Sequence, residues 1–287
     1  MSTFAMNSPM GDSQCIPGYL RSLAARKCSR ESIRTAKSVL NGVESLLERC
    51  LLDLEPPDLA EWQAERAEAI SARTLRTKMV WIHGFYAWAV ETGLLEEDPS
   101  RRMRTPKVPR LLPRPMPEDR LQAAIDQATD RIHVILLLAA YAGLRAAEIA
   151  DLAWSEVQLD GDEPTLRIIG KGERERIVDI APDLRTALLA LPHRRGPVVR
   201  RGDGKPVHNS ANNLSKVANR YLRDLEIPDT LHSLRHRFGT QLCKVAGIRV
   251  TQEALGHASI TTSSLYAEVG RREIRPAVIS IGRVMAS

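Results

Sequence analysis

The stretch Leu231-His-Ser-Leu-Arg-His-Arg-Phe-Gly-Thr240 places His232 three residues before Arg235, in a run whose pattern predicts a helix over residues 232–246. Side chains three positions apart point to the same side of a helix. An imidazole can carry a proton, and a guanidinium fork matches the oxygens of a phosphate. The pair therefore indicates chemistry at a phosphate, and His236, the next residue after Arg235, is expected either to brace it from inside or to face solvent.

A second arginine lies upstream in Tyr141-Ala-Gly-Leu-Arg-Ala-Ala-Glu148. Arg145 is the natural partner of Arg235, because two guanidinium groups can hold the non-bridging oxygens of one phosphodiester. Glu148 follows three residues later, one helical turn away. We expect it either to orient its neighbours or to serve as an ordinary N-terminal helix charge.

Lys171 lies between two glycines in Ile169-Gly-Lys-Gly172. The β-like runs 165–169 and 176–180 flank this segment, so the pattern predicts a hairpin with Lys171 at its tip. There the flexible ammonium group can reach an oxygen that leaves a phosphate.

The last candidates lie in Leu255-Gly-His-Ala-Ser-Ile-Thr-Thr-Ser-Ser-Leu-Tyr266. His257 follows a helix-ending glycine and can donate a hydrogen bond to a transition state. Tyr266 supplies a hydroxyl whose pKa of about 10 falls only when cations are near. Each residue alone is common in proteins, but the ordered set contains cations, an acid, a base and a nucleophile.

This set needs no metal and no cofactor. We find no His, Asp and Glu group with metal-ligand spacing. The four cysteines, Cys15, Cys28, Cys50 and Cys243, are scattered, which argues against a zinc site or a disulfide framework and favours reduced thiols.

The bulk properties agree with a soluble protein of two domains. The chain has 287 residues, of which 43% are hydrophobic and 26% charged. Its net charge of +6 favours a polyanionic partner. The first 15 residues lack the apolar core of a secretory signal, and the apolar run 134–144 is too short to cross a bilayer. We therefore expect a cytoplasmic location and no membrane partner.

The expected fold class is mainly α with a small β-sheet. We expect a disordered lead over residues 1–15, a helical domain over 16–103, a basic proline-rich linker over 104–117, and a mixed domain over 118–287. Basic side chains on two helix faces and in the linker are candidates for contacts with phosphates: Arg34, Lys37, Arg73, Arg76, Lys78, Lys107, Arg110 and Arg114.

These motifs, in this order, resemble the tyrosine recombinase family of phage integrases and Xer-type recombinases. The resemblance covers about residues 16–275 and implies a helical core-binding domain and a catalytic domain that clamp duplex DNA. It implies that Tyr266 attacks the scissile phosphate to give a 3′-phosphotyrosyl link, with Lys171 as general acid. Arg145 and Arg235 would then bind the phosphate, and His232 and His257 would assist.

The resemblance also implies a homotetramer on two DNA sites, a monomer in free solution, passage through a Holliday junction, and a possible accessory DNA-bending protein. Because only about 15 residues precede the core-binding pattern, we expect a phage-type integrase without an arm-binding domain. The alternatives are an Xer-like chromosome dimer resolvase or invertase, a type IB topoisomerase-like nicking and closing enzyme, and a non-catalytic DNA-binding relative.

Overall fold

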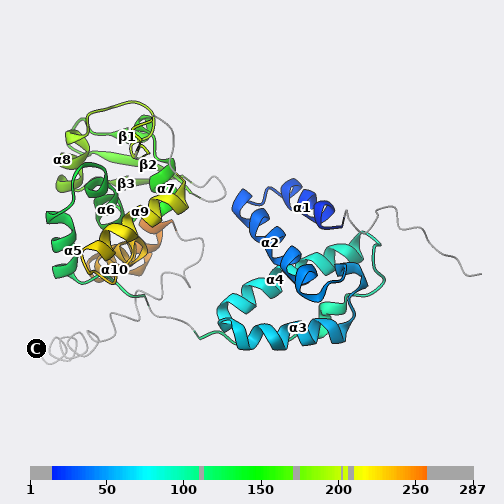
Figure 1. Ribbon diagram of the computed structural model, residues 1–287. Coiled ribbons are helices and arrows are strands. Elements are labelled where there is room, and N and C mark those ends of the chain that lie inside the picture. The colour runs from blue at the N-terminus through cyan, green and yellow to red at the C-terminus, as the bar shows by residue number, and fades with distance from the viewer. Residues whose placement is uncertain (1–14, 110–112, 171–174, 202, 206–209, 257–287) are drawn as a thin grey trace, which may run out of the picture. The chain divides into compact units, whose positions relative to one another are not determined.

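The computed structural model describes residues 15–109, 113–170, 175–201, 203–205 and 210–256 (Figure 1). The chain divides into two compact units, residues 1–110 and 111–287, here named the N-terminal unit and the C-terminal unit. The division falls within the proline-rich segment 104–117, whose described residues form neither helix nor strand. No helix among the described residues is both long and apolar enough to span a membrane.

The N-terminal unit is built from helices alone in its described part. They are α1 (Cys15–Ala25), α2 (Arg30–Leu47), the 3-10 helix η2 (Leu51–Asp53), α3 (Pro56–Ala69), α4 (Ala72–Glu91) and the 3-10 helix η3 (Pro99–Arg102). Two serines start the longest of these helices. The hydroxyl of Ser29 accepts from the Ser32 N–H ahead of α2, and that of Ser71 accepts from the Thr74 N–H ahead of α4.

Aromatic side chains fill the core of this unit. Tyr19 of α1 meets the Phe85 ring of α4 edge-on at 5.7 Å between centroids, and Phe85 meets Tyr86 at 5.2 Å. The buried Tyr86 hydroxyl donates to the Leu51 carbonyl at 2.8 Å, so no polar group is stranded there. This bond joins the long helix α4 to η2.

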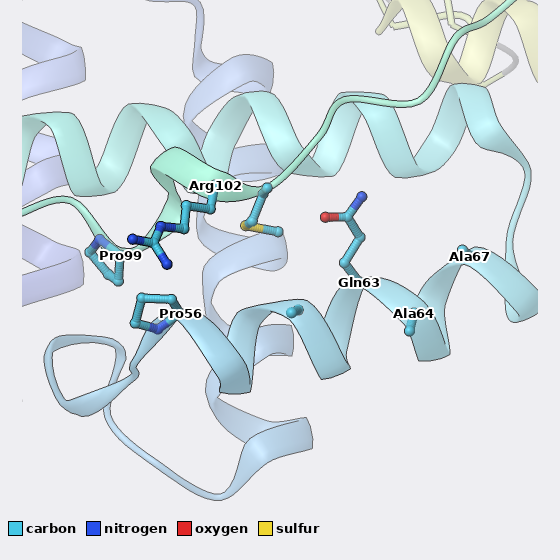
Figure 2. Close-up of a pocket in the computed structure, with 8 residues that line it drawn as sticks. Pro56, Gln63, Ala64, Ala67, Pro99 and Arg102 are labelled. Carbon is cyan, nitrogen blue, oxygen red and sulfur yellow. The ribbon is translucent and has the colours of Figure 1, made fainter.

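A cavity of about 290 Å³ lies between α3 and η3 (Figure 2). The α3 side contributes small side chains such as Ala64 and Ala67, and the η3 side contributes Pro99 and Arg102. Gln63 of α3 donates to the Arg104 carbonyl at 2.8 Å and so holds the chain beyond η3 against this helix. The lining residues include no carboxylate, histidine or cysteine.

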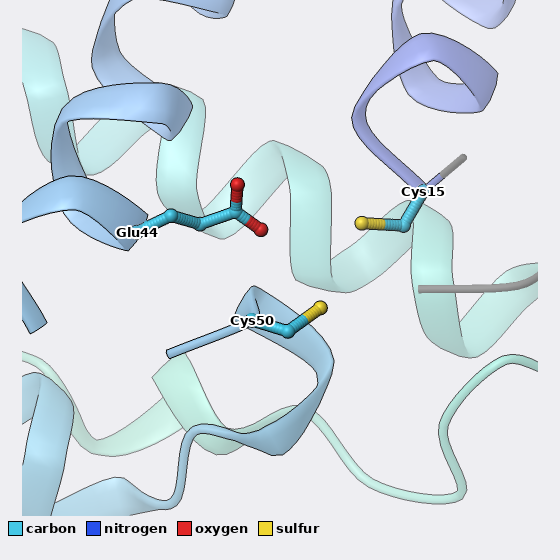
Figure 3. Close-up of side chains that lie close together, drawn as sticks. All are labelled: Cys15, Glu44 and Cys50. Atoms are coloured by element: carbon cyan, nitrogen blue, oxygen red, sulfur yellow. The ribbon is translucent and has the colours of Figure 1, made fainter. Parts of the chain in front are cut away.

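Two of the cysteines meet in the N-terminal unit although 35 positions separate them in sequence (Figure 3). The thiols of Cys15 and Cys50 and the carboxylate of Glu44 each bring one ligand atom within 4.8 Å of the others. Glu44 also accepts the Leu51 N–H at 3.1 Å. The cysteines are scattered in sequence, but this pair is close in the fold, because α1, α2 and η2 pack their ends together.

The C-terminal unit combines helices with one small antiparallel sheet. Its helices are α5 (Glu118–Asp126), α6 (Asp130–Tyr141), α7 (Ala146–Asp151), the 3-10 helix η4 (Trp154–Glu156), α8 (Pro182–Ala190), α9 (Ala211–Asp224) and α10 (Leu231–Leu255). The strands β1 (Val157–Gln158), β2 (Thr165–Ile169) and β3 (Glu175–Asp179) pair in that order, with Arg167 opposite Ile177. The predicted fold class, mainly α with a small sheet, is confirmed.

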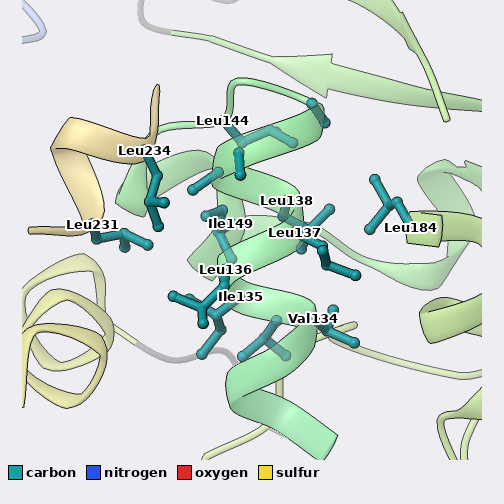
Figure 4. Packing of buried hydrophobic residues seen from close by; sticks show 14 of the residues in the cluster. Val134, Ile135, Leu136, Leu137, Leu138, Leu144, Ile149, Leu184, Leu231 and Leu234 are labelled. Carbon is teal, nitrogen blue, oxygen red and sulfur yellow. The ribbon is translucent and has the colours of Figure 1, made fainter. Parts of the chain in front are cut away.

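Helix α6 lies at the centre of the C-terminal core. Its residues 134–140 are all buried, which explains why this run shows no amphipathic pattern. Figure 4 shows Leu231 and Leu234 of α10 on one side of α6 and Leu184 of α8 on the other. This packing fixes both α6 and α10. Arg145 follows α6 in the chain and Arg235 lies within α10, so the core positions both predicted phosphate-binding residues.

Several predicted element bounds differ from the observed ones. Cys15, assigned to the lead, is the buried first residue of α1. The sequence pattern predicts a helix from Glu118 to Asp130, but α5 ends at Asp126 and α6 starts at Asp130 after a short break. The second predicted strand begins one residue earlier, at Glu175. The sequence pattern predicts two helices, over 232–246 and 250–255, and within α10 the backbone leaves helical geometry between them, at Gly247.

The central position of α6 gives a stability prediction. Leu138 is completely buried, so Leu138→Ala should lower the free energy of unfolding by about 2 to 5 kcal/mol through lost burial and a residual cavity. Leu189 on α8 is 53% exposed, so Leu189→Ala should change it by less than about 0.5 kcal/mol. Urea unfolding curves measure both values, and equal costs would contradict the described core.

Candidate catalytic site

Arg145 and Glu148 form the start of α7. Arg145 occupies the N-cap in extended conformation, and the Glu148 carboxylate turns back to accept the Arg145 backbone N–H at 2.8 Å. The Arg145 guanidinium also donates to this carboxylate at 2.9 Å through Nη1. The three-residue spacing of Arg145 and Glu148 is therefore explained by a capping arrangement that also fixes the arginine side chain.

Two more arginines converge on the same carboxylate from distant segments. Arg176 of β3 donates to both oxygens of Glu148, at 3.0 Å from Nη1 and 2.9 Å from Nη2. Arg235 of α10 places Nη1 at 3.6 Å from Glu148 Oε2. The Glu148 side chain is only 5% exposed, so one buried acid collects three arginines from α7, β3 and α10.

The cations keep Glu148 ionised. Burial by itself would raise the pKa of this carboxyl group, but hydrogen bonds from Arg176 and from the Arg145 N–H, with the charges of Arg176 and Arg235, outweigh it. The net effect lowers the pKa. Glu148 thus contacts its neighbours and also caps the start of α7, and its role in orienting the arginines stays a prediction.

Arg235 is held at both ends of its guanidinium group. Nη1 donates to the Gly143 carbonyl, and Nη2 donates to the Leu255 carbonyl at 2.8 Å. Gly143 has a φ of 63°, and a Cβ at that position would lie 2.4 Å from the Phe238 ring of α10. Glycine is therefore required there by both backbone conformation and packing. The Arg235 side chain is 2% exposed, whereas that of Arg145 is 41% exposed.

Two histidines lie one turn apart on the same helix as Arg235. The rings of His232 and His236 are 4.3 Å apart and meet edge-on. Partial desolvation and the charges of Arg235 and Arg145 lower the pKa of His232. Desolvation, His232 and Arg235 lower the pKa of His236 to about 4. Both imidazoles are therefore neutral near pH 7, and His232, which is the more exposed, can accept a proton.

The structure brings together Arg145, Glu148, His232, Arg235 and His236. Lys171, His257 and Tyr266 lie outside the described residues, as does Arg110. Of the residues predicted to contact phosphates, Lys78 is half-buried, and the other described ones are exposed: Arg34, Lys37, Arg73, Arg76, Lys107 and Arg114. Arg34 pairs with Glu31 on its own helix at 2.7 Å.

Sequence reasoning missed Arg176. It identified this arginine only as the start of a β run, because its partner Glu148 lies 28 positions earlier and no local spacing joins them. A possible signal is a lone charged residue whose side chain faces the core in a short amphipathic strand.

A metal-ligand group exists elsewhere among the described residues. Cys15, Glu44 and Cys50 offer sulfur and oxygen ligands that suit a soft divalent ion. This group belongs to the N-terminal unit, whereas all the candidate catalytic residues belong to the C-terminal unit.

The comparisons with known proteins give the family. A sequence profile described as the phage integrase family matches residues 114–272. Tyrosine recombinase XerC of Xylella fastidiosa is 32% identical over 219 residues, which cover 72% of this chain and 73% of the relative. Tyrosine recombinase XerD of Ralstonia nicotianae is 32% identical over 249 residues, which cover 79% of each chain.

Solved structures share the fold. A lambda integrase dimer bound to a COC′ core site has a TM-score of 0.72 at 16% identity, over 87% of this chain and 96% of the integrase chain. XerH recombinase in a post-cleavage complex with a palindromic difH substrate has a TM-score of 0.70 at 19% identity, over 93% and 84%. The protein therefore belongs to the phage integrase family and is a tyrosine recombinase, an enzyme that transfers DNA strands.

The lowered histidine pKa values predict an acid-sensitive fold. Unfolded His236 titrates near its ordinary pKa of 6.5, whereas the folded residue titrates at about 4, so the unfolded chain binds more protons in between. The free energy of unfolding should therefore fall as pH drops from 6.5 towards 4. His236→Asn should make this fall smaller. Urea unfolding at pH 7 and pH 5 measures the difference, and an equal fall in both proteins would contradict a desolvated neutral His236.

Proposed function

We propose that this recombinase cleaves and rejoins duplex DNA at a specific site through a 3′-phosphotyrosyl link on Tyr266. The observation that carries the proposal is the gathering of Arg145 and Arg235 around one ionised carboxylate, beside the neutral imidazole of His232. Two fixed guanidinium groups fit the two non-bridging oxygens of a phosphodiester. The order of the motifs along the chain supports the assignment of the remaining groups.

In the proposed reaction the phenolic oxygen of Tyr266 bonds to phosphorus while the bond to the 5′ oxygen breaks. The phenolic proton passes to a base, for which the neutral and exposed His232 is the best described candidate. The leaving 5′ oxygen takes a proton from Lys171. Arg145 and Arg235 neutralise the charge that grows on the non-bridging oxygens, and His257 adds a hydrogen bond.

Rejoining is the reverse attack. A 5′ hydroxyl from the partner strand displaces the tyrosine, so the energy of the broken bond is kept and no nucleotide cofactor is consumed. Because the scheme conserves one phosphodiester per step, strands from two DNA sites can be exchanged. A lambda integrase tetramer bound to a Holliday junction shares this fold, with a TM-score of 0.72, which supports the proposal of four protomers on two sites.

The proposal also gives the two units a joint task as a clamp on duplex DNA. The exposed basic residues of α2 and α4 belong to the N-terminal unit, and Arg114 belongs to the C-terminal unit. Lysine and arginine side chains that neutralise phosphates release counterions and so supply affinity without sequence preference. The basic net charge of +6 supports this role.

The biological task has two candidates. A phage-type integrase is the first. An Xer-type recombinase acting on the host chromosome is the second, and the XerC and XerD names of relatives that are 32% identical favour it. Mapping the bound sites on host and mobile DNA separates the two.

The central test is covalent capture. Nicked duplex fragments taken from the DNA around the protein's own gene are incubated with the protein, and an SDS-resistant adduct is measured on gels. Wild type should form the adduct and Tyr266→Phe should lose it completely while still binding DNA, because phenylalanine lacks the attacking oxygen. Tyr141→Phe is the matched control, since Tyr141 is half-buried with its ring near Arg237 and has no assigned role. Equal adducts from wild type and Tyr266→Phe would contradict the assigned nucleophile.

The proposed phosphate contacts predict a steep dependence of DNA affinity on salt. A combined Arg73→Gln, Arg76→Gln and Lys78→Gln variant should reduce the slope of log affinity against log salt by about 3, from roughly 0.9 per lost phosphate contact. Fluorescence anisotropy titrations between low and moderate salt give both slopes. An unchanged slope would remove this face of α4 from the DNA interface.

A further inference from the structure

Arg176 joins three separate segments of the C-terminal unit. It extends from β3, donates to both oxygens of Glu148 on α7, and uses Nε to donate to the Ala254 carbonyl of α10 at 2.9 Å. Its side chain is 9% exposed. All three nitrogens of the guanidinium group therefore donate to acceptors within the protein.

Arg176 and Arg235 together hold the end of α10. The last carbonyls of a helix have no partner within the helix. Here the Ala254 carbonyl accepts from Arg176 and the Leu255 carbonyl accepts from Arg235, at 2.9 and 2.8 Å. Both cations also interact favourably with the partial negative charge at the C-terminal end of the helix.

The chain turns immediately after these two carbonyls. Gly256 adopts a left-handed conformation with φ of 60°, and a Cβ there would lie 3.0 Å from Arg176 Nη1. A side chain at this position would therefore push on the arginine. His257 is the next residue and Tyr266 follows nine positions later, so the segment with both predicted groups leaves α10 at the point that Arg176 fixes.

We propose that Arg176 is a positioning residue for strand cleavage that acts through Glu148 and the end of α10. It holds Glu148 in place, and Glu148 in turn orients Arg145 and Arg235 for the phosphate. It also fixes the start of the segment that carries the nucleophile. This role rests on the proposed function of Arg145, Arg235 and Tyr266.

Only arginine can make this set of contacts. Its planar fork gives two parallel bonds to a carboxylate and a third donor in a different direction, whereas a lysine ammonium group is a single point of charge. Arg167 on the neighbouring strand β2 shows the contrast. Its side chain is 47% exposed and pairs loosely with Glu156 and Glu175 at 3.7 and 3.2 Å, which is an ordinary surface arrangement.

The test compares single-turnover cleavage of nicked DNA by full-length proteins with Arg176→Lys, Glu148→Gln and both changes. Arg167→Lys is the matched control. Arg176→Lys should lower the rate constant of adduct formation by about 10- to 100-fold, because misplacement of a catalytic group by about 1 Å has such effects. The amount of adduct at completion and the DNA affinity should stay at wild-type levels. The control should keep the wild-type rate.

The double variant tests whether Arg176 acts through Glu148. If it does, the rate loss in the double variant is smaller than the product of the two single losses, because both changes remove the same contact between Arg176 and Glu148. Should Arg176→Lys fail to fold, Arg176→Gln replaces it in the single and double variants. With Glu148→Gln it leaves two neutral side chains where the ion pair was.

Three outcomes would overturn the proposal. A lower amount of adduct with an unchanged rate constant would mean that Arg176 serves stability alone. Rate losses that multiply fully in the double variant would mean that none of the effect of Arg176 passes through Glu148, which contradicts the proposed route. An Arg176→Lys variant that cleaves as fast as an active wild type would mean that Arg176 has no positioning role. A wild-type protein that forms no adduct would instead overturn the proposed function itself.

Discussion

The carboxylate of Glu148 is the group on which the arrangement of the site depends. A buried acid without partners would take up a proton, because desolvation penalises its charged form. Here Arg145, Arg176 and Arg235 reach it from α7, β3 and α10, and their charges and hydrogen bonds keep it ionised. Three cations would repel one another without it. The acid and the arginines therefore hold each other in place.

The same cluster contributes to the protonation state of the nearby histidines. Desolvation, together with the arginine charges, keeps His232 and His236 neutral, so an imidazole able to accept a proton lies beside guanidinium groups able to bind an anion. The positive charge of an arginine disfavours a second positive charge nearby, so it disfavours the protonated form of a neighbouring histidine. In the proposed reaction this effect leaves His232 unprotonated, and so able to accept a proton, at the pH at which Tyr266 must lose one.

Sequence patterns predicted the parts of this site that depend on local spacing. His232 and Arg235 share a helix face, and Arg145 and Glu148 lie one turn apart at the start of α7. Contacts between distant segments were beyond such patterns. Arg176 reaches Glu148 only when the fold brings β3 and α7 within hydrogen-bonding distance, and Cys15 approaches Cys50 only when α1, α2 and η2 come together. Helix ends differed by a few residues where the predicted pattern ran on through a break, as at Asp126.

The most direct measurement on this account is the pKa of Glu148. Its side-chain carboxyl carbon can be followed by NMR in isotope-labelled protein, with Glu148→Gln used to assign the signal, from pH 7 down to the pH of unfolding. Because the cations outweigh burial, the signal should stay that of an ionised carboxylate to a pH below the ordinary value of 4.5. A titration at or above 4.5 would show that burial prevails, and that an ionised Glu148 does not organise the three arginines.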